Sequence, residues 1–176
     1  MDIYWHELNA YGGEIKDIAA KDEAFRKDPS SVGNLTHFGI GLSNRALLIV
    51  VGLCALVESR LFELAEEEES RHQFKVDDLA GQGLKRLQKY LSRSKRIDFG
   101  KIRNWDRFTA VYEIRNTFVH SYGGLVETKL IPKAEAALKN LNIKDALFGR
   151  RIRLNSNHML QIHGIFESLF EELRQV

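Results

Sequence analysis

NRALLIVVGLCALVESRLFELAEEEES, residues 44–70, carries the strongest structural signal in the chain. Its first half is apolar nearly all round, and its second half becomes amphipathic before it ends in a run of glutamates. A helix that is apolar on all sides has to be buried, so we expect residues 44–70 to form a central helix of the core. Ser43 precedes this stretch, and its hydroxyl suits the N-cap position.

The rest of the chain continues the helical pattern on both sides of this segment. Only two prolines, Pro29 and Pro132, interrupt 176 residues, and Gly12-Gly13 and Gly123-Gly124 predict breaks between helices. We expect six further helices, over residues 2–10, 14–27, about 77–92, 98–122, 127–141 and from Asn155 or Ser156 onward. Residues 147–154 contain a glycine and alternate enough to predict a short hairpin or an irregular loop.

These elements predict an all-α, up-and-down helical bundle. A chain of 176 residues is long enough for one sizeable core and too short for two. We therefore expect one helical domain over residues 41–176, with residues 1–40 as an N-terminal helical extension.

Composition indicates a reducing compartment. The chain has one cysteine, Cys54, so no intramolecular disulfide can form. Its first residues lack the basic and apolar regions of a secretory signal, and the apolar run from Ala46 to Val57 is shorter than a typical membrane span. A cytoplasmic protein without membrane contact is the expectation.

Charge is segregated along the chain although the net charge is only +2. Residues 85–107 hold nine lysines and arginines against two aspartates, whereas residues 58–78 hold eight acids against three basic residues. The basic stretch could attract a polyanion such as RNA, through Lys85, Lys89, Arg93 and Arg96, or it could be an ordinary solvated helix face.

RNTFVHSY, residues 115–122, brings an arginine, a histidine and a tyrosine close together in an otherwise apolar helical pattern. Arg115 offers a planar cation that binds phosphate oxygens through two parallel hydrogen bonds. His120 can accept or donate a proton near neutral pH. Together they could cleave RNA without a metal, because the histidine can deprotonate a ribose 2′-hydroxyl and the arginine can offset charge on the phosphorus oxygens.

The spacing Arg-x-x-x-x-His-x-Tyr, with Asn116 directly after the arginine, resembles the signature of the HEPN superfamily. The resemblance implies a metal-independent, cofactor-free endoribonuclease of toxin–antitoxin or phage-defence systems that acts as a homodimer. It implies that Arg115 stabilises the phosphate, that His120 is the general acid or base and that Asn116 orients His120 or a phosphate oxygen. It also implies that a nucleotidyltransferase antitoxin could modify Tyr122 with AMP.

Helix geometry limits how the two motif residues can cooperate. Arg115 and His120 point about 140° apart on an ideal helix, whereas Asn116 and His120 differ by only about 40°. A common site therefore needs the arginine side chain to curl round, a distortion near the helix end, or two motif helices that meet across a two-fold axis. The third arrangement fits the implied dimer, and we favour it.

Two other interpretations stay open. The motif could belong to a non-catalytic HEPN-like module that binds nucleotide, RNA or a protein, or to a plain helical bundle in which Arg115 pairs with a carboxylate such as Glu58 or Glu113. His158 and His163 are five residues apart, which is not the spacing of two metal ligands on one helix face. No metal site is expected.

Overall fold

The computed structural model describes residues 2–31, 35–121 and 124–175. Within these ranges the chain forms six α-helices and one two-stranded hairpin, so the predicted all-α fold is confirmed. The helices are α1 (Ile3–Lys27), α2 (Leu35–Glu69), α3 (Gly83–Ser94), α4 (Trp105–Val119), α5 (Ile131–Asn140) and α6 (Ser156–Leu173). Short 3-10 turns cover Pro29–Ser31, Val76–Asp78 and Thr128–Leu130.

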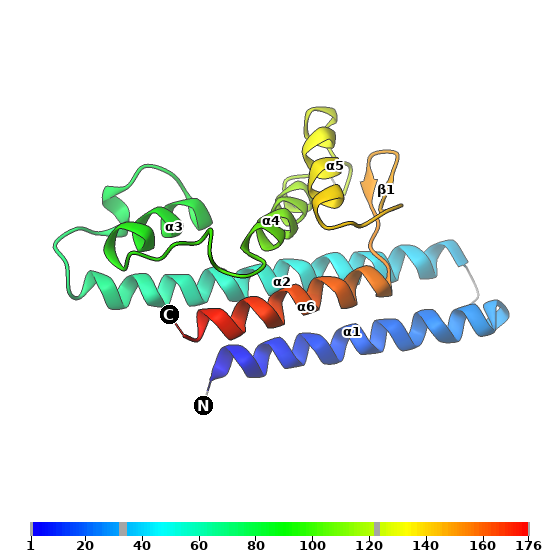
Figure 1. Cartoon of the computed structure of the whole chain (residues 1–176). Helices are drawn as coiled ribbons and strands as arrows, with labels where there is room; N and C mark the ends of the chain where they lie inside the picture. The colour runs from blue at the N-terminus through cyan, green and yellow to red at the C-terminus, as the bar shows by residue number, and fades with distance from the viewer. Residues whose placement is uncertain (1, 32–34, 122–123, 176) are drawn as a thin grey trace.

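Three long helices form the body of the molecule, and the other three are attached to it. Helices α1, α2 and α6 pack on one another along their lengths (Figure 1). Helices α3 and α4 both pack on α2, and α5 packs on α4. In Figure 1, α3 and the α4–α5 pair rise from the same side of α2 and leave a space between them.

The hairpin before the last helix is present, as one of the two predicted alternatives. Strands β1 (Leu147–Phe148) and β2 (Arg151–Ile152) pair antiparallel, and Gly149 in the turn has a φ of 59°, a left-handed conformation that favours glycine. Helix α6 then begins as expected, because the Asn155 side chain accepts a hydrogen bond from the backbone N–H of His158 at 3.0 Å.

The central helix is longer than the sequence predicts. Helix α2 begins at Leu35, so the expected N-cap at Ser43 is wrong. Ser43 is buried within the helix, and its hydroxyl accepts a hydrogen bond from the backbone N–H of Leu154 at 3.2 Å. The added turns contact α1 through the tilted rings of Phe25 and Phe38, whose centroids are 5.1 Å apart, so tertiary packing supports a segment of weak helix propensity. The expected division between residues 40 and 41 falls inside α2.

Helix α2 is also long and apolar enough, by length and composition, to cross a membrane. Its most apolar window has a mean hydropathy of 2.1, and half of that window is buried inside the protein. Core helices of soluble proteins meet the same criterion, so the observation is weak evidence for a membrane span.

Helix α1 is continuous through Gly12-Gly13, so the predicted break there is wrong. Gly12 lies where α1 crosses α6, and a Cβ at this position would be 2.9 Å from Nε2 of His163. The same ring nitrogen donates to the carbonyl of Leu8 at 3.1 Å. Gly12 therefore permits a close helix contact, and the packing of α1 on α6 offsets the weak helix propensity of glycine.

We expect opposite stability effects at the two adjacent glycines. Gly12→Ala should destabilise the fold by about 1–3 kcal/mol, because the new methyl group forces the His163 ring to move. Gly13→Ala should stabilise it by about 0.5–1 kcal/mol, since nothing lies within 4 Å of its Cβ and alanine favours the helix. Urea unfolding of both variants measures the difference, and equal effects would contradict the close contact.

The starts of α3 and α4 also differ from the prediction. Asp78 caps only the short turn Val76–Asp78, where it accepts a hydrogen bond from Lys75 N–H at 2.8 Å, and α3 begins later at Gly83. Asp98 accepts from Gly100 N–H at 3.1 Å, and α4 begins at Trp105. In both places the aspartate stabilises a local turn instead of the following helix.

Helix α4 carries an apolar stripe for most of its length. Trp105 and Phe108 are buried, and the stripe continues through Tyr112, which is half-buried. Val119 is 45% exposed, because the buried side of the last turns runs through Ile114 and Thr117. The side chains of this stripe thus change from buried at the start of α4 to exposed at the motif.

Candidate functional site

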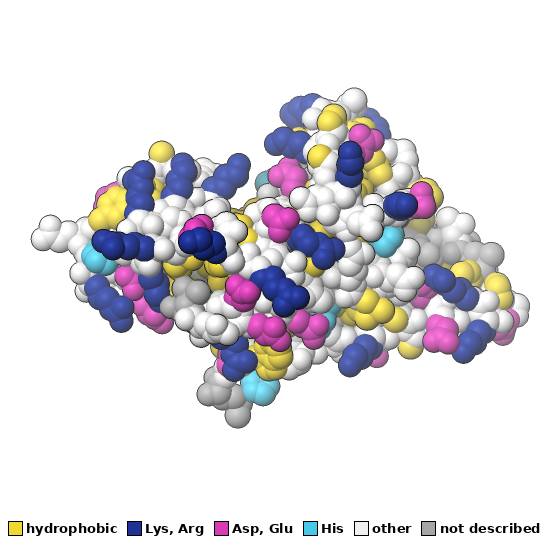
Figure 2. All heavy atoms as spheres, in the orientation of Figure 1, with side chains coloured by type: hydrophobic (Ala, Val, Ile, Leu, Met, Phe, Trp, Pro, Cys, Tyr) yellow, Lys and Arg dark blue, Asp and Glu magenta, His cyan; other side chains and the backbone are white. Residues whose placement is uncertain are grey.

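A pocket of about 660 Å³ lies between α3 and the α4–α5 pair. Its lining comes from all of these helices and from Glu58 of α2. Figure 2 shows the surface hollowed between α3 and the α4–α5 pair, with lysine and arginine side chains on both sides of the hollow. We call this pocket the α3–α4 cleft.

Four residues of the motif line the α3–α4 cleft of a single chain, among them the predicted site residues Arg115, Asn116 and His120; the fourth is Thr117. Helix α4 ends at Val119, and His120 is its C-cap with φ −91° and ψ 9°, so the last position departs from ideal helix geometry. The long Arg115 side chain provides the remaining reach. A second copy of the chain is therefore not needed for both residues to reach one pocket, although a dimer is compatible with this arrangement.

The Arg115 guanidinium is held on three sides. Its Nη1 donates to the side-chain oxygen of Asn116 at 2.8 Å, and its Nη2 lies 3.7 Å from a carboxylate oxygen of Glu58. The guanidinium carbon lies 5.3 Å from the ring centroid of Tyr112, in cation–π range. Its Nε is buried and has no hydrogen-bond partner among the described residues. The site thus contains an arginine that is oriented but retains unused donors.

Glu58 joins Arg115 to Tyr112. The Tyr112 hydroxyl donates a hydrogen bond of 2.7 Å to Oε1 of Glu58, while Oε2 faces Arg115. Burial, together with this hydrogen bond, raises the pKa of Tyr112 to about 12, so the phenol keeps its proton at physiological pH. The structural role that the sequence allowed for Glu58, as a partner of Arg115, is present as this ion pair.

His120 is exposed at the mouth of the cleft. Its backbone N–H donates to the carbonyl of Asn116 at 3.0 Å, which completes the last turn of α4. Its imidazole forms no hydrogen bond with another described residue. The ring is therefore accessible to a ligand or to solvent.

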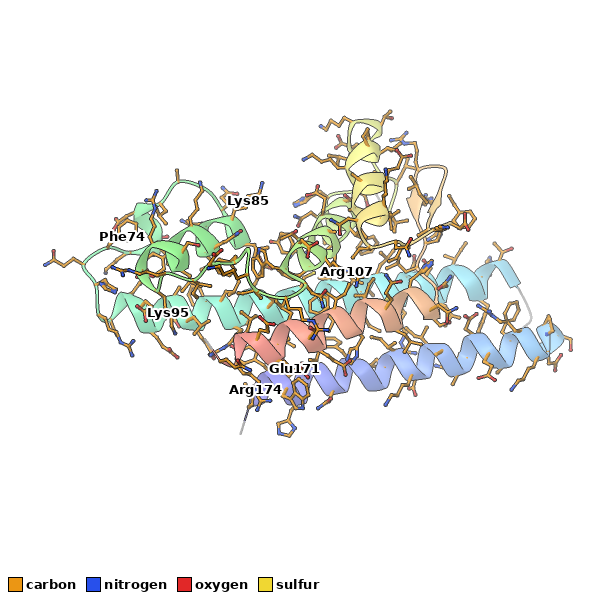
Figure 3. All side chains as sticks on the ribbon, viewed as in Figure 1. Phe74, Lys85, Lys95, Arg107, Glu171 and Arg174 are labelled. Carbon is orange, nitrogen blue, oxygen red and sulfur yellow. The ribbon has the colours of Figure 1, made fainter. Side chains whose placement is uncertain are left out.

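The basic residues of α3 divide into two groups. Lys85 lines the cleft, and Figure 3 shows it at the end of α3 that faces α4. Lys89, Arg93 and Arg96 are exposed but lie outside the cleft lining, and the Lys89 ammonium donates to the carbonyl of Ala80 at 3.5 Å. Of the four residues predicted to bind RNA, only Lys85 lines the cleft together with the motif.

The opposite wall supplies a cation that the sequence analysis did not select. Lys133 of α5 lines the cleft, and its ammonium lies 3.9 Å from a carboxylate oxygen of Glu113 on α4. The sequence analysis also missed Tyr112 as a site residue, because it continues the apolar stripe of Trp105 and Phe108. Its position three residues before Arg115 was the available signal, since residues three apart are neighbours on a helix.

Tyr122, the last residue of the motif, lies outside the described residues. Its expected modification is therefore a prediction that rests on the sequence. Among the described residues, no cluster of three or more His, Cys, Asp or Glu side chains could hold a metal ion.

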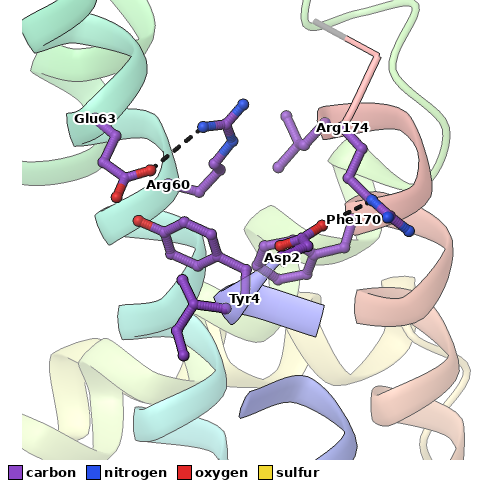
Figure 4. Close-up of a pocket in the computed structure, with 8 residues that line it drawn as sticks. Asp2, Tyr4, Arg60, Glu63, Phe170 and Arg174 are labelled. Atoms are coloured by element: carbon purple, nitrogen blue, oxygen red, sulfur yellow. Dashed lines mark hydrogen bonds and ion pairs between the residues drawn. The ribbon is translucent and has the colours of Figure 1, made fainter. Parts of the chain in front are cut away.

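A smaller pocket at the other side of α2 provides a comparison. It has a volume of about 290 Å³, and Figure 4 shows Tyr4, Arg60, Glu63 and Arg174 around it. Arg60 lies 3.3 Å from Glu63, and Arg174 lies 2.7 Å from Asp2. Both arginines have carboxylate partners here, and no titratable histidine lines this pocket.

Comparison of the chain with family models, with curated proteins and with solved structures finds no match.

Proposed function

We propose that this protein is a metal-independent endoribonuclease of HEPN type. The support is the convergence of Arg115, Asn116 and His120 on one cleft that also contains Lys85 and Lys133. An oriented guanidinium, a free imidazole and two lysines form a group of side chains suited to a phosphodiester. We place the enzyme in the cytoplasm, in a toxin–antitoxin or phage-defence setting.

The reaction follows from the two motif side chains. His120, as the neutral imidazole, removes the proton from a ribose 2′-hydroxyl, and the 2′-oxygen attacks the adjacent phosphorus. The P–O5′ bond breaks, and the leaving 5′-oxygen takes a proton from the imidazolium or from water. Arg115 binds the non-bridging oxygens, whose charge rises in the transition state. The products carry a 2′,3′-cyclic phosphate and a free 5′-hydroxyl.

Arg115 has the donors for this task. A guanidinium carries five N–H groups, and only one donates to a described residue, Asn116. The buried Nε–H has no acceptor, which is an unfavourable state for a polar group inside a protein. A phosphate oxygen in the cleft, reached by a small movement of the side chain, would provide one.

The RNA would enter between two basic walls. Lys85 and Lys133 face the cleft from α3 and α5 and would bind phosphates next to the reacting one. Lys89, Arg93 and Arg96 lie on the exposed side of α3 and beyond it, where they would hold the strand outside the cleft. This binding is electrostatic and should weaken as salt concentration rises.

The HEPN resemblance adds two proposals about partners. A homodimer through the motif helix would bring two α3–α4 clefts close together. A nucleotidyltransferase antitoxin would transfer AMP to Tyr122 and add negative charge beside the cleft, which would oppose RNA binding.

One observation favours a second candidate, a non-catalytic module that binds nucleotide, RNA or protein. Glu58 already lies 3.7 Å from Arg115, and this pairing reduces the positive potential that a phosphate would meet. In that case the α3–α4 cleft would bind a ligand through Lys85, Lys133 and Asn116 without cleavage.

Incubation with RNA separates the two candidates. Purified protein is mixed with total RNA in EDTA, and the ends of the products are identified. The nuclease proposal expects cleavage with 2′,3′-cyclic phosphate ends by the wild type, and none by His120→Ala, because the variant lacks the group that moves the proton. Equal cleavage by both proteins, or none by either, would contradict it.

A further inference from the structure

We infer that Glu58 is a positioning residue of the α3–α4 cleft, which orients Arg115 in the free protein and competes with a phosphate for it. This inference rests on the proposed function for its catalytic part. Its binding part concerns only the recognition of a phosphodiester anion by Arg115.

The first support is the way in which Glu58 divides its two oxygens. One accepts a hydrogen bond of 2.7 Å from Tyr112, and the other lies 3.7 Å from Nη2 of Arg115. Tyr112 in turn places its ring 5.3 Å from the guanidinium carbon. The three side chains therefore form a closed triangle, in which the tyrosine fixes the carboxylate and supports the face of the cation.

The second support is the position of this triangle at the junction of three helices. Glu58 belongs to α2, and Tyr112 and Arg115 belong to α4. Gly83, the first residue of α3, has a φ of 52°, and a Cβ there would be 3.5 Å from the Tyr112 hydroxyl and 3.6 Å from Oε1 of Glu58. The start of α3 thus packs against the pair, and the orientation of Arg115 is fixed by the helical scaffold.

The third support is the length of the Glu58–Arg115 contact. At 3.7 Å the two groups attract each other as charges but are too far apart for a hydrogen bond. Both side chains are partly exposed, 23% for Glu58 and 21% for Arg115, so water weakens the attraction. Glu58 can therefore orient the guanidinium and still yield to a phosphate, which binds arginine through two hydrogen bonds.

Two consequences follow for a ligand. A phosphate in the cleft meets the negative charge of Glu58 as well as the positive charge of Arg115, so Glu58 lowers affinity in the ground state. The same carboxylate keeps the guanidinium in place for the transition state, where small displacements reduce the rate. Glu58 thus lowers the affinity of the cleft for a phosphate but orients the Arg115 guanidinium. A merely structural residue would not have this combined effect.

The experiment compares Glu58→Gln with Glu63→Gln. Glutamine keeps the shape of the side chain and can still accept the hydrogen bond from Tyr112, but it removes the charge. Glu63 is a matched control on the same helix, because it also lies near an arginine, Arg60 at 3.3 Å, and also interacts with a tyrosine, Tyr4, but outside the α3–α4 cleft. Both variants change the net charge equally.

The binding probe is a single-stranded DNA oligonucleotide, which lacks the 2′-hydroxyl and cannot be cleaved by the proposed reaction. We expect Glu58→Gln to bind it about three- to tenfold more tightly than the wild type, and Glu63→Gln to bind it like the wild type. With an RNA oligonucleotide of the same sequence, kcat should fall about tenfold in Glu58→Gln while KM decreases.

The outcomes are distinguishable. Weaker DNA binding by Glu58→Gln together with a lower unfolding midpoint would indicate a structural residue and overturn the inference, as would behaviour identical to that of Glu63→Gln. Tighter binding of DNA with no RNA cleavage by the wild type would overturn the nuclease proposal and leave the competition between Glu58 and phosphate supported. Tyr112→Phe keeps the ring but removes the hydrogen bond to Glu58, and we expect it to lower kcat with DNA affinity unchanged.

Discussion

Replacing Arg115 with alanine should lower the rate of RNA cleavage by about 10²- to 10³-fold, the usual effect of removing a group that stabilises transition-state charge. In the α3–α4 cleft this arginine is the only motif side chain with a permanent positive charge. Lys85 and Lys133 line the same cleft but come from its two walls, and neither offers the planar pair of donors of the guanidinium that Arg115 contributes. The rate is measured on a labelled RNA oligonucleotide under single-turnover conditions.

The same substitution should leave the stability almost unchanged. The Glu58–Arg115 pair is partly exposed and 3.7 Å long, and pairs of this kind contribute about 0–1 kcal/mol. The substitution also removes the buried Nε that lacks a partner. Arg115→Lys is the companion variant, since it keeps the charge but loses the planar pair of donors, and we expect an intermediate rate. A large fall in melting temperature with an unaffected rate would instead show that Arg115 is structural.

Phe108→Ala should have the largest effect on stability, a loss of about 3–5 kcal/mol in the free energy of unfolding. The Phe108 side chain is fully buried in α4, at 0% exposure. Its ring centroid lies 5.1 Å from that of Trp105, 5.7 Å from that of Phe166 and 6.0 Å from that of Tyr112. Removing the ring leaves a cavity where α4 meets α6 and also removes the aromatic neighbour of Tyr112.

Urea unfolding followed by circular dichroism measures this loss. Phe108→Leu keeps most of the volume and should cost much less, so it gives a value even where Phe108→Ala does not fold. Phe148→Ala in β1 is the matched control, because this phenylalanine is 63% exposed and should contribute little. Similar losses for Phe108→Ala and Phe148→Ala would contradict the assignment of Phe108 to the core.

The sequence was sufficient for the elements whose signals are local. Helix α6 combines an asparagine cap with a continuous apolar face, and α5 accommodates Pro132 in its first turn, where no backbone donor is needed. The apolar pattern of residues 44–70 likewise identified the core helix. In each case the helix propensity and the apolar periodicity agree, so no distant contact is required to select the structure.

The errors occur where distant contacts override local preference. The pair Gly12-Gly13 favours a break, but α1 continues because Gly12 permits close packing on His163 of α6. Ser43 suits an N-cap, but its hydroxyl binds the backbone of Leu154 instead. These partners are more than a hundred residues away in the chain, and a local pattern cannot reveal them.

The candidate site was predictable to a similar extent. The motif identifies Arg115, Asn116 and His120, and ideal helix geometry raised the question of how the first and last could share a site. The answer depends on where α4 ends, which periodicity does not fix. Tyr112 and Glu58 were harder to assign, because the hydrogen bond between them joins residues 54 positions apart in the sequence.

Helix α2 sets the width of the α3–α4 cleft. The end of α4 lies near Leu47 and Leu48 of α2, and Tyr112 of α4 donates a hydrogen bond to Glu58 of α2. Helix α3 lies beside residues 62–69 of α2. Each residue of an α-helix adds about 1.5 Å to its length. The width of the cleft is therefore set by the distance along α2 between its contacts with α4 and with α3, and not by the segment that joins α3 to α4. Residues 95–104 of that segment do not line the cleft, so changes in them should leave its width constant. If the cleft binds RNA as we propose, α2 therefore limits the width of the strand that the cleft accepts.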